Sequence, residues 1–212
     1  MNYSQLSTLI QEYCESTEQS FVANIPTFVQ LAEERIYNTV QLPAIRKNVT
    51  GAMSADNQYM SLPSDWLSTF SMAVIDPVTG EYEYLLNKDV NFIRASSPFP
   101  TSKGKPKYYA IWDDNFMILG PTPDLSYNSE LHYYYYPPSI VTNSTSWLGD
   151  NFENVLLYGA VREGYTYLKG EQDIMNYYEQ KYQEALAQLK RLGDGLDRQD
   201  AYRSGQARIP VT

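Results

Sequence analysis

Apolar residues recur at helical spacing near the beginning of the chain. In residues 4–14 they occupy positions i, i+3, i+4 and i+7, on one face of a helix: Leu6, Leu9, Ile10 and Tyr13. Ser4 is available as the N-cap of this helix. A second helix is expected from Pro26 to about residue 39, because proline suits the first helical position and apolar residues recur every fourth position. Glu33, Glu34 and Arg35 are then expected at its solvent edge.

From residue 45 to about residue 147 the pattern changes to short alternating or aromatic runs separated by turn residues. This texture predicts a β region. The candidate strands are residues 47–53, 57–61, 68–76, 81–86, 107–112, 115–119 and 129–136. Asp113-Asp114 is expected to form the turn of a hairpin, and residues 87–94 are expected to form one helical turn or more.

The helical pattern returns at Asp150, a candidate N-cap, and continues to about residue 169. Nearly every residue in 152–161 is apolar or small, so this helix is expected to be central among the helices. Two glycines inside it weaken the helix intrinsically, and close approach of a neighbouring helix or subunit would explain them: Gly159 and Gly164.

Residues 172–192 carry apolar side chains on one stripe, which predicts a long amphipathic helix with Gly193 as its C-terminal cap. The residues after it have almost no apolar periodicity and are expected to be extended. These elements predict an α+β fold in which the N- and C-terminal segments form an antiparallel helical bundle around an inserted antiparallel β domain. The expected parts are a bundle of residues 1–42 with 149–193, a β domain at 43–148, and an extended C-terminal arm at 194–212.

Composition and charge narrow the classes of function. Hydrophobic residues make up 43% of the chain, too many for a disordered polymer. With a formal charge of −9, the chain lacks the basic surface that nucleic-acid binding requires. No secretory signal is evident, and no run approaches the ~18 apolar residues of a membrane helix, so we expect a soluble protein without a membrane partner. The 20 tyrosines suit half-buried sheets and interfaces.

Motifs that carry chemistry are absent from the sequence. One cysteine, Cys14, and one histidine, His132, are too few for the common zinc sites, and no phosphate-binding loop or nucleophile motif is found. We therefore expect no catalytic residue, no metal site, no cofactor and a structural function. Two alternatives stay open: a tail-associated glycan hydrolase with paired carboxylates, and a carbohydrate-binding module with an exposed Trp66, Trp112 or Trp147.

Several strings along the chain are long enough to be specific. They are Phe21-Val-Ala-Asn-Ile-Pro-Thr-Phe28, Ala32-Glu-Glu-Arg-Ile-Tyr37, Leu42-Pro-Ala-Ile-Arg-Lys47, Tyr84-Leu-Leu-Asn-Lys-Asp-Val-Asn-Phe92, Trp147-Leu-Gly-Asp-Asn-Phe152, Tyr167-Leu-Lys-Gly-Glu171, and the tail Gly193-Asp-Gly195 with Asp200-Ala-Tyr-Arg-Ser-Gly-Gln206. In these strings the chain resembles the head-to-tail adaptor (connector) proteins of short-tailed, podovirus-type bacteriophages. The resemblance covers essentially the whole chain.

The resemblance implies a structural virion protein at the head–tail junction, made in the host bacterial cytoplasm. It implies a ring of about twelve copies that joins the portal to the tail nozzle and fibres. Genomic DNA would pass through its channel without sequence-specific binding. It also implies that the C-terminal arm reaches along the portal. The arm combines charge-assisted donors with aromatic and apolar anchors that suit this contact: Arg198, Tyr202, Arg203, Arg208, Ile209 and Pro210.

Overall fold

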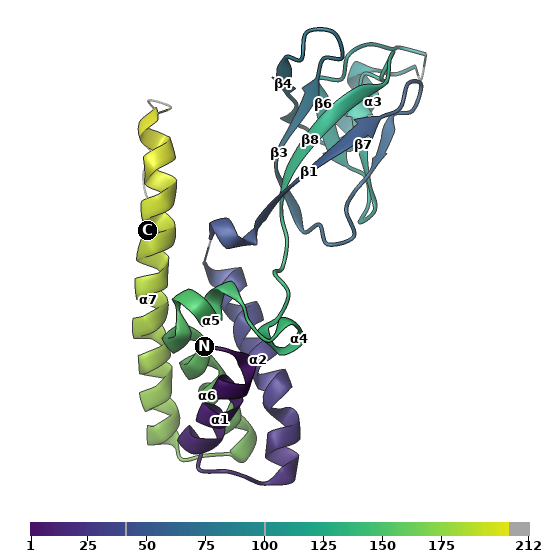
Figure 1. The fold of residues 1–212 in the computed structure, drawn as a ribbon. Helices are drawn as coiled ribbons and strands as arrows, with labels where there is room; N and C mark the ends of the chain where they lie inside the picture. Colours follow the sequence, from purple (N-terminus) through teal and green to yellow (C-terminus); the bar gives the residue numbers. More distant parts are fainter. Residues whose placement is uncertain (41, 100, 204–212) are drawn as a thin grey trace. The chain divides into compact units, whose positions relative to one another are not determined.

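The chain forms two compact units, one helical and one built mainly from β-strands (Figure 1). The helical unit comprises Met1–Ile45 and the chain from Tyr136 onward, and the β unit is Arg46–Tyr135. The expected α+β class is confirmed. The expected insert at 43–148 is longer than the β unit, because residues 136–148 belong to the helical unit.

The computed structural model describes residues 1–40, 42–99 and 101–203, with the backbone alone at 43 and 194–203. No helix in these ranges has both the length and the apolar character that crossing a membrane requires.

The first segment of the helical unit contains α1 (Tyr3–Tyr13), α2 (Gln19–Thr39) and the short 3₁₀ helix η1 (Pro43–Ile45). Asn2, not Ser4, caps α1: its side chain accepts a hydrogen bond from the backbone N–H of Gln5 at 2.9 Å. α2 begins well before Pro26, so the expected start of this helix is wrong. A proline inside a helix removes one hydrogen bond, and burial on both sides of it offsets this loss: Phe21, Ile25, Phe28 and Val29.

The second segment contains α4 (Ile140–Asn143), α5 (Trp147–Asn151), α6 (Glu153–Leu168) and α7 (Gln172–Arg203). The single helix expected from Asp150 is wrong, because Ser146 caps α5 and Phe152 leaves the helical conformation between α5 and α6. α6 contacts α1, α2, α5 and α7, which confirms its central position.

The glycines of α6 permit close helix approach within the helical unit, as expected. A Cβ added at Gly159 would lie 3.0 Å from Cβ of Ala32 on α2. A Cβ added at Gly164 would lie 3.0 Å from Sγ of Cys14 and 3.3 Å from the ring of Phe21. Larger residues would therefore push α6 away from its neighbours.

The helix α7 has 32 residues and continues to Arg203. The expected cap at Gly193 is wrong, and residues 194–203 are helical, not extended. A glycine inside a helix costs only ~1 kcal/mol, which does not end a helix whose next residues include no proline. Among the described glycines only Gly80 has the positive φ that such a cap uses. Residues 204–212 of the expected arm lie outside the described residues.

The β unit contains two four-stranded sheets and the helix α3 (Val90–Ser96). The first sheet has the strand order β1 (Arg46–Met53), β8 (Tyr127–Tyr134), β3 (Ser68–Ile75) and β4 (Tyr82–Tyr84). The second has the order β2 (Tyr59–Ser61), β7 (Phe116–Gly120), β6 (Tyr108–Ile111) and β5 (Leu86–Asn87). The predicted strands agree to within about two residues, except that the strand expected at 81–86 is divided between the two sheets.

The named strands pair antiparallel except β5 and β6, which are parallel. The chain passes through α3 between these two strands, and a parallel pair requires such a crossover. The expectation of a purely antiparallel β domain is therefore wrong at this place. The expected helical turn at 87–94 is α3, and Asp89 caps it by accepting from the N–H of Phe92 at 2.9 Å.

The two sheets share one hydrophobic core. Along β8 every second residue is buried, including Tyr127, Leu131 and Tyr133, and the residues between them are more exposed. The second sheet contributes Tyr109, Met117 and Leu119 to the same core. Its other face lies against α3, where a smaller buried cluster forms: Ile93, Ala110 and Ile118. The β unit thus has three layers.

Candidate interaction surface

The partner-binding residues expected in the arm fall at the edge of the described chain. Arg198, Tyr202 and Arg203 lie in the last turns of α7, where the backbone alone is described. Arg208, Ile209 and Pro210 lie outside the described residues. The assignment of a portal contact to the arm therefore stays a prediction.

Neither of the two residues with nucleophile or ligand chemistry stands in a reactive setting. Cys14 is buried, as expected, and burial raises the pKa of its thiol to about 12, which disfavours the reactive thiolate. His132 lies on the outer face of β8, where its Nε2 is 2.8 Å from Glu130 Oε1 and 2.9 Å from Asn48 Nδ2. No group of three or more metal-ligating side chains occurs in the described ranges.

Asp113 and two of the three tryptophans form contacts that stabilise the fold. Asp113 forms the β6–β7 turn, as expected, by accepting from the N–H groups of Asn115 and Phe116 at 2.8 Å. Trp66 packs against the sheet core and donates to Thr69 Oγ1, and Trp147 packs on a neighbouring phenylalanine. Trp112 alone among the three tryptophans is substantially exposed, at 46%.

An exposed cluster of aromatic and cationic side chains surrounds α3 on the outer face of the second sheet. We call it the α3 surface. Its members are Tyr59, Leu86, Lys88, Phe92, Arg94, Tyr108, Trp112 and Phe116.

One side of the α3 surface joins α3 to β5 and β6. The rings of Phe92 and Tyr108 meet edge to face with 5.2 Å between centroids. Leu86 is 59% exposed and is the register partner of Tyr108 in the parallel pair, which puts both side chains on one face. Lys88 Nζ lies 5.2 Å from the Phe92 ring centroid, within range of a cation–π interaction.

The other side of the α3 surface joins α3 to β2 and the β6–β7 hairpin. The guanidinium carbon of Arg94 is 5.5 Å from the Trp112 ring centroid, and Nη2 of Arg94 donates to the hydroxyl of Tyr59 at 2.9 Å. Tyr59 packs edge to face on Trp112 at 5.6 Å. Phe116, 43% exposed, lies opposite Trp112 across the hairpin, where the N–H of Trp112 bonds its carbonyl. These contacts hold the rings in fixed positions.

The cations of the α3 surface differ from three other lysines of the β unit. Lys47, Lys103 and Lys105 form ion pairs with carboxylates at 2.6–3.4 Å. In the described chain, Lys88 and Arg94 form no ion pair and lie over aromatic rings instead. Aromatic residues and arginine are the types that dominate binding energy at protein interfaces. The α3 surface therefore has the chemistry of a protein-binding site.

Sequence reasoning missed this surface because its members come from separate segments. The residues lie at 59, 86–94, 108–116, and each segment alone reads as a strand or a turn of helix. The parallel β5–β6 pair brings the second and third segments together, and the β2–β7 pair brings Tyr59 beside them. The one available signal was the density of aromatic residues next to Lys88 and Arg94.

The comparisons with known proteins identify the family. A family model described as SU10 adaptor protein matches residues 1–210. The chain belongs to the SU10 adaptor protein family. This family consists of phage adaptors, which are structural proteins and not enzymes, and it indicates a virion protein. The family match confirms the resemblance to phage adaptors. A search of curated proteins finds no match.

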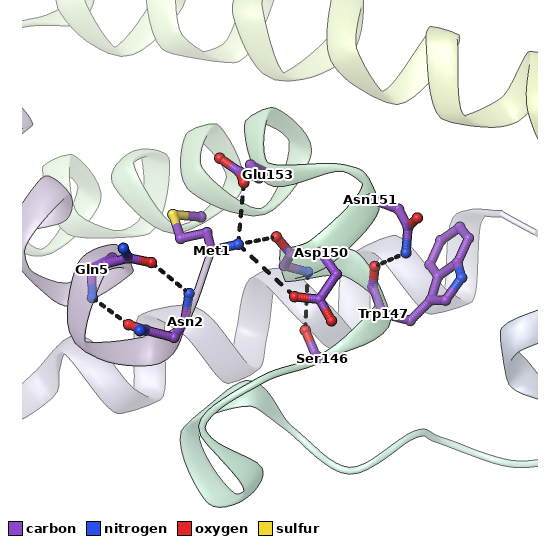
Figure 2. Close-up of polar contacts among 9 residues, drawn as sticks. Met1, Asn2, Gln5, Ser146, Trp147, Asp150, Asn151 and Glu153 are labelled. Carbon is purple, nitrogen blue, oxygen red and sulfur yellow. Dashed lines mark hydrogen bonds and ion pairs between the residues drawn. The ribbon is translucent and has the colours of Figure 1, made fainter.

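In this SU10 adaptor the string Trp147 to Phe152 has a clear structural role (Figure 2). It forms α5 and holds the beginning of the chain. The α-amino group of Met1 donates to the carbonyl of Gly149 at 2.7 Å and lies 3.1 Å from Glu153 Oε1. An added Cβ at Gly149 would lie 2.7 Å from the carbonyl oxygen of Met1, so only glycine fits.

A buried carboxylate joins α2 and α4 in the adaptor. Glu33 is 4% exposed, and its Oε1 accepts a hydrogen bond from the N–H of Ile140 at 3.0 Å. Burial raises the pKa of Glu33. Its expected place at the solvent edge is wrong, because it shares the buried face of α2 with Val29 and Ile36.

Proposed function

We propose that this SU10 adaptor forms a closed ring at the head–tail junction of a short-tailed phage, joins the portal to the tail nozzle and fibres, and continues the DNA channel. The family match over residues 1–210 is the observation that carries the proposal. About twelve copies are expected, by resemblance to podovirus-type adaptors. A ring of identical copies closes only when each copy has two different complementary surfaces.

The charge of the chain suits a channel for DNA. Each copy carries a formal charge of −9. Phosphate attraction to lysine and arginine is what retains DNA on proteins, so an acidic wall lets DNA slide past without sequence-specific binding. We propose no catalytic, metal or cofactor role for any residue, and place the protein in the virion after synthesis in the host cytoplasm.

We propose that the helices of the two terminal segments form an antiparallel bundle that builds the ring. The end of the chain, residues 194–212, is proposed to dock on the portal. Residues 194–203 continue α7 as a helix, so this part rises about 1.5 Å per residue. Residues 204–212 reach at most ~30 Å when extended. The proposed contacts are those of Arg198, Tyr202, Arg203, Arg208, Ile209 and Pro210.

A portal-binding assay tests this function. The full chain is mixed with purified portal rings, and the complex is isolated by sedimentation. We expect the full chain to bind and a variant lacking residues 196–212 to remain folded, with nearly unchanged melting, but not to bind. The cut lies beyond Tyr182, Leu186 and Leu189, the buried residues that fix α7 on the helical unit.

A matched pair of substitutions sharpens the assay. Arg203→Ala should weaken portal binding more than Asp197→Ala, because arginine can form a bidentate bond to a carboxylate. Normal portal occupancy by the truncated chain would contradict the role of the arm and would move the attachment surface to the helical unit itself.

A further inference from the structure

We propose that the α3 surface binds an acidic segment of a tail protein that inserts one apolar side chain beside Trp112 and another beside Leu86. This inference rests on the proposed adaptor function and adds to it the surface and the chemistry of one partner.

The apolar part of the surface is exposed and already ordered. Leu86, Trp112 and Phe116 are each more than 40% exposed. The rings of Phe92 and Trp112 are fixed by edge-to-face contacts with Tyr108 and Tyr59. A partner that binds such rings loses little side-chain entropy, because the rings do not need to be immobilised on binding.

The charge of the surface calls for an acidic partner. Within the described chain, Lys88 and Arg94 lack a carboxylate partner, whereas the other β-unit lysines named above have one. Their charged groups contact aromatic rings and neutral oxygens. Carboxylates of an acidic partner would gain a charge-assisted hydrogen bond from each of these groups.

The division of the chain into units points to the tail as the source of this partner. The proposed portal contact belongs to the end of α7, in the helical unit, so the portal is served without the α3 surface. A sugar is disfavoured because it stacks on an open ring face, while Trp112 already holds the Arg94 guanidinium over its ring.

The test measures binding of purified tail proteins of the same phage, added one at a time to adaptor–portal complexes. The variants are Arg94→Glu, Leu86→Glu and Trp112→Ala. Lys107→Glu is the matched control, because Lys107 is exposed directly before β6, and strand alternation puts it on the opposite face from Tyr108. Melting curves and ring mass are recorded for every variant.

We expect one tail protein to bind the wild type and each of the three variants to weaken this binding at least about tenfold. Lys107→Glu should stay within about twofold of the wild type. Raising salt from about 50 to about 500 mM should weaken wild-type binding more than that of Arg94→Ala, because the salt screens the proposed ion pairs.

Unchanged tail binding by Arg94→Glu and Leu86→Glu overturns the inference, as does a wild type that binds no tail protein while seated on the portal. Loss of the ring by stably folded variants would assign the surface to a second copy, and an oligosaccharide signal abolished by Trp112→Ala would assign it to sugar. Both also overturn it. Failure of the wild type to bind the portal is a different outcome, because it contradicts the proposed adaptor function and not the assignment of the α3 surface.

Discussion

One carboxylate of the helical unit and two of the β unit lie in contrasting environments. In the helical unit Glu33 is buried, and burial raises its pKa. In the β unit Asp65 and Asp76 stay near the surface, where hydrogen bonds from Lys47 and from the Thr79 and Val78 N–H groups lower their pKa values. Acid should therefore favour the folded state through Glu33 and disfavour it through Asp65 and Asp76.

The largest expected loss of stability comes from substitutions in the core of either unit. Leu156→Ala in the helical unit and Leu131→Ala in the β unit should each cost ~2–5 kcal/mol, because both side chains are at most 1% exposed. Denaturant unfolding followed by circular dichroism and by tryptophan fluorescence gives the free energies. Leu31→Ala is the control, since Leu31 is 44% exposed on α2. A loss for Leu156→Ala no larger than that for Leu31→Ala would show that α6 is not central.

The next largest loss of stability is expected at a glycine with rigid neighbours, Gly149, and it is compared with that at Gly51, which has a flexible neighbour. Gly149→Ala should cost ~1–3 kcal/mol, because the new Cβ would meet the Met1 carbonyl at 2.7 Å and Ile140 Cδ1 at 2.8 Å. Gly51→Ala in the β unit should cost less, since its closest neighbour, at 3.1 Å, is the flexible end of Met60. Thermal melting measures both. Equal losses would contradict the role given to α5 in holding the first residues.

A pH series tests the buried carboxylate. Glu33→Ala should cost ~1–3 kcal/mol by leaving the N–H of Ile140 unpaired, whereas Glu33→Gln keeps an acceptor and removes the buried charge. The folded state binds a proton at Glu33 more readily than the unfolded state, so its contribution to stability is present below about pH 4.5 and is lost as pH rises through the raised pKa. Glu33→Gln should abolish this slope. An identical pH profile in Glu33→Gln would contradict the account.

The smallest expected effect concerns His132. His132→Ala removes contacts with Glu130 and Asn48 at an exposed strand face, so it should change stability by at most about 0.5 kcal/mol and leave virion assembly intact. Phage yield in a complementation assay measures assembly. Loss of assembly by a stably folded variant would count against a purely structural function.

Local patterns predicted most of the fold, and the errors arose where distant contacts decide the outcome. Strand alternation placed the β strands, and the apolar run from Phe152 to Val161 placed the central helix. Pro26 and Gly193 predict helix ends because both residue types are unfavourable inside a helix. At Pro26, burial of the flanking residues offsets that cost.

The sites were harder to predict than the fold. Glu33 was expected in solvent because nothing near it in sequence shows that Ile140 returns to α2. The α3 surface depends on strand pairings that join three separate segments, and no single segment carries its signal. The resemblance in strings such as Trp147 to Phe152 indicated the family, and the structure supplies the reason for that string in the contacts of Met1 and Gly149.

The central claim is that this SU10 adaptor forms a ring between the portal and the tail. Imaging of purified heads arrested before tail attachment, with and without the adaptor, tests it most directly. The account predicts one closed ring of about twelve adaptor copies beneath the portal, absent from heads that lack the adaptor. Heads that carry the adaptor as scattered single copies, or only away from the portal vertex, would contradict it.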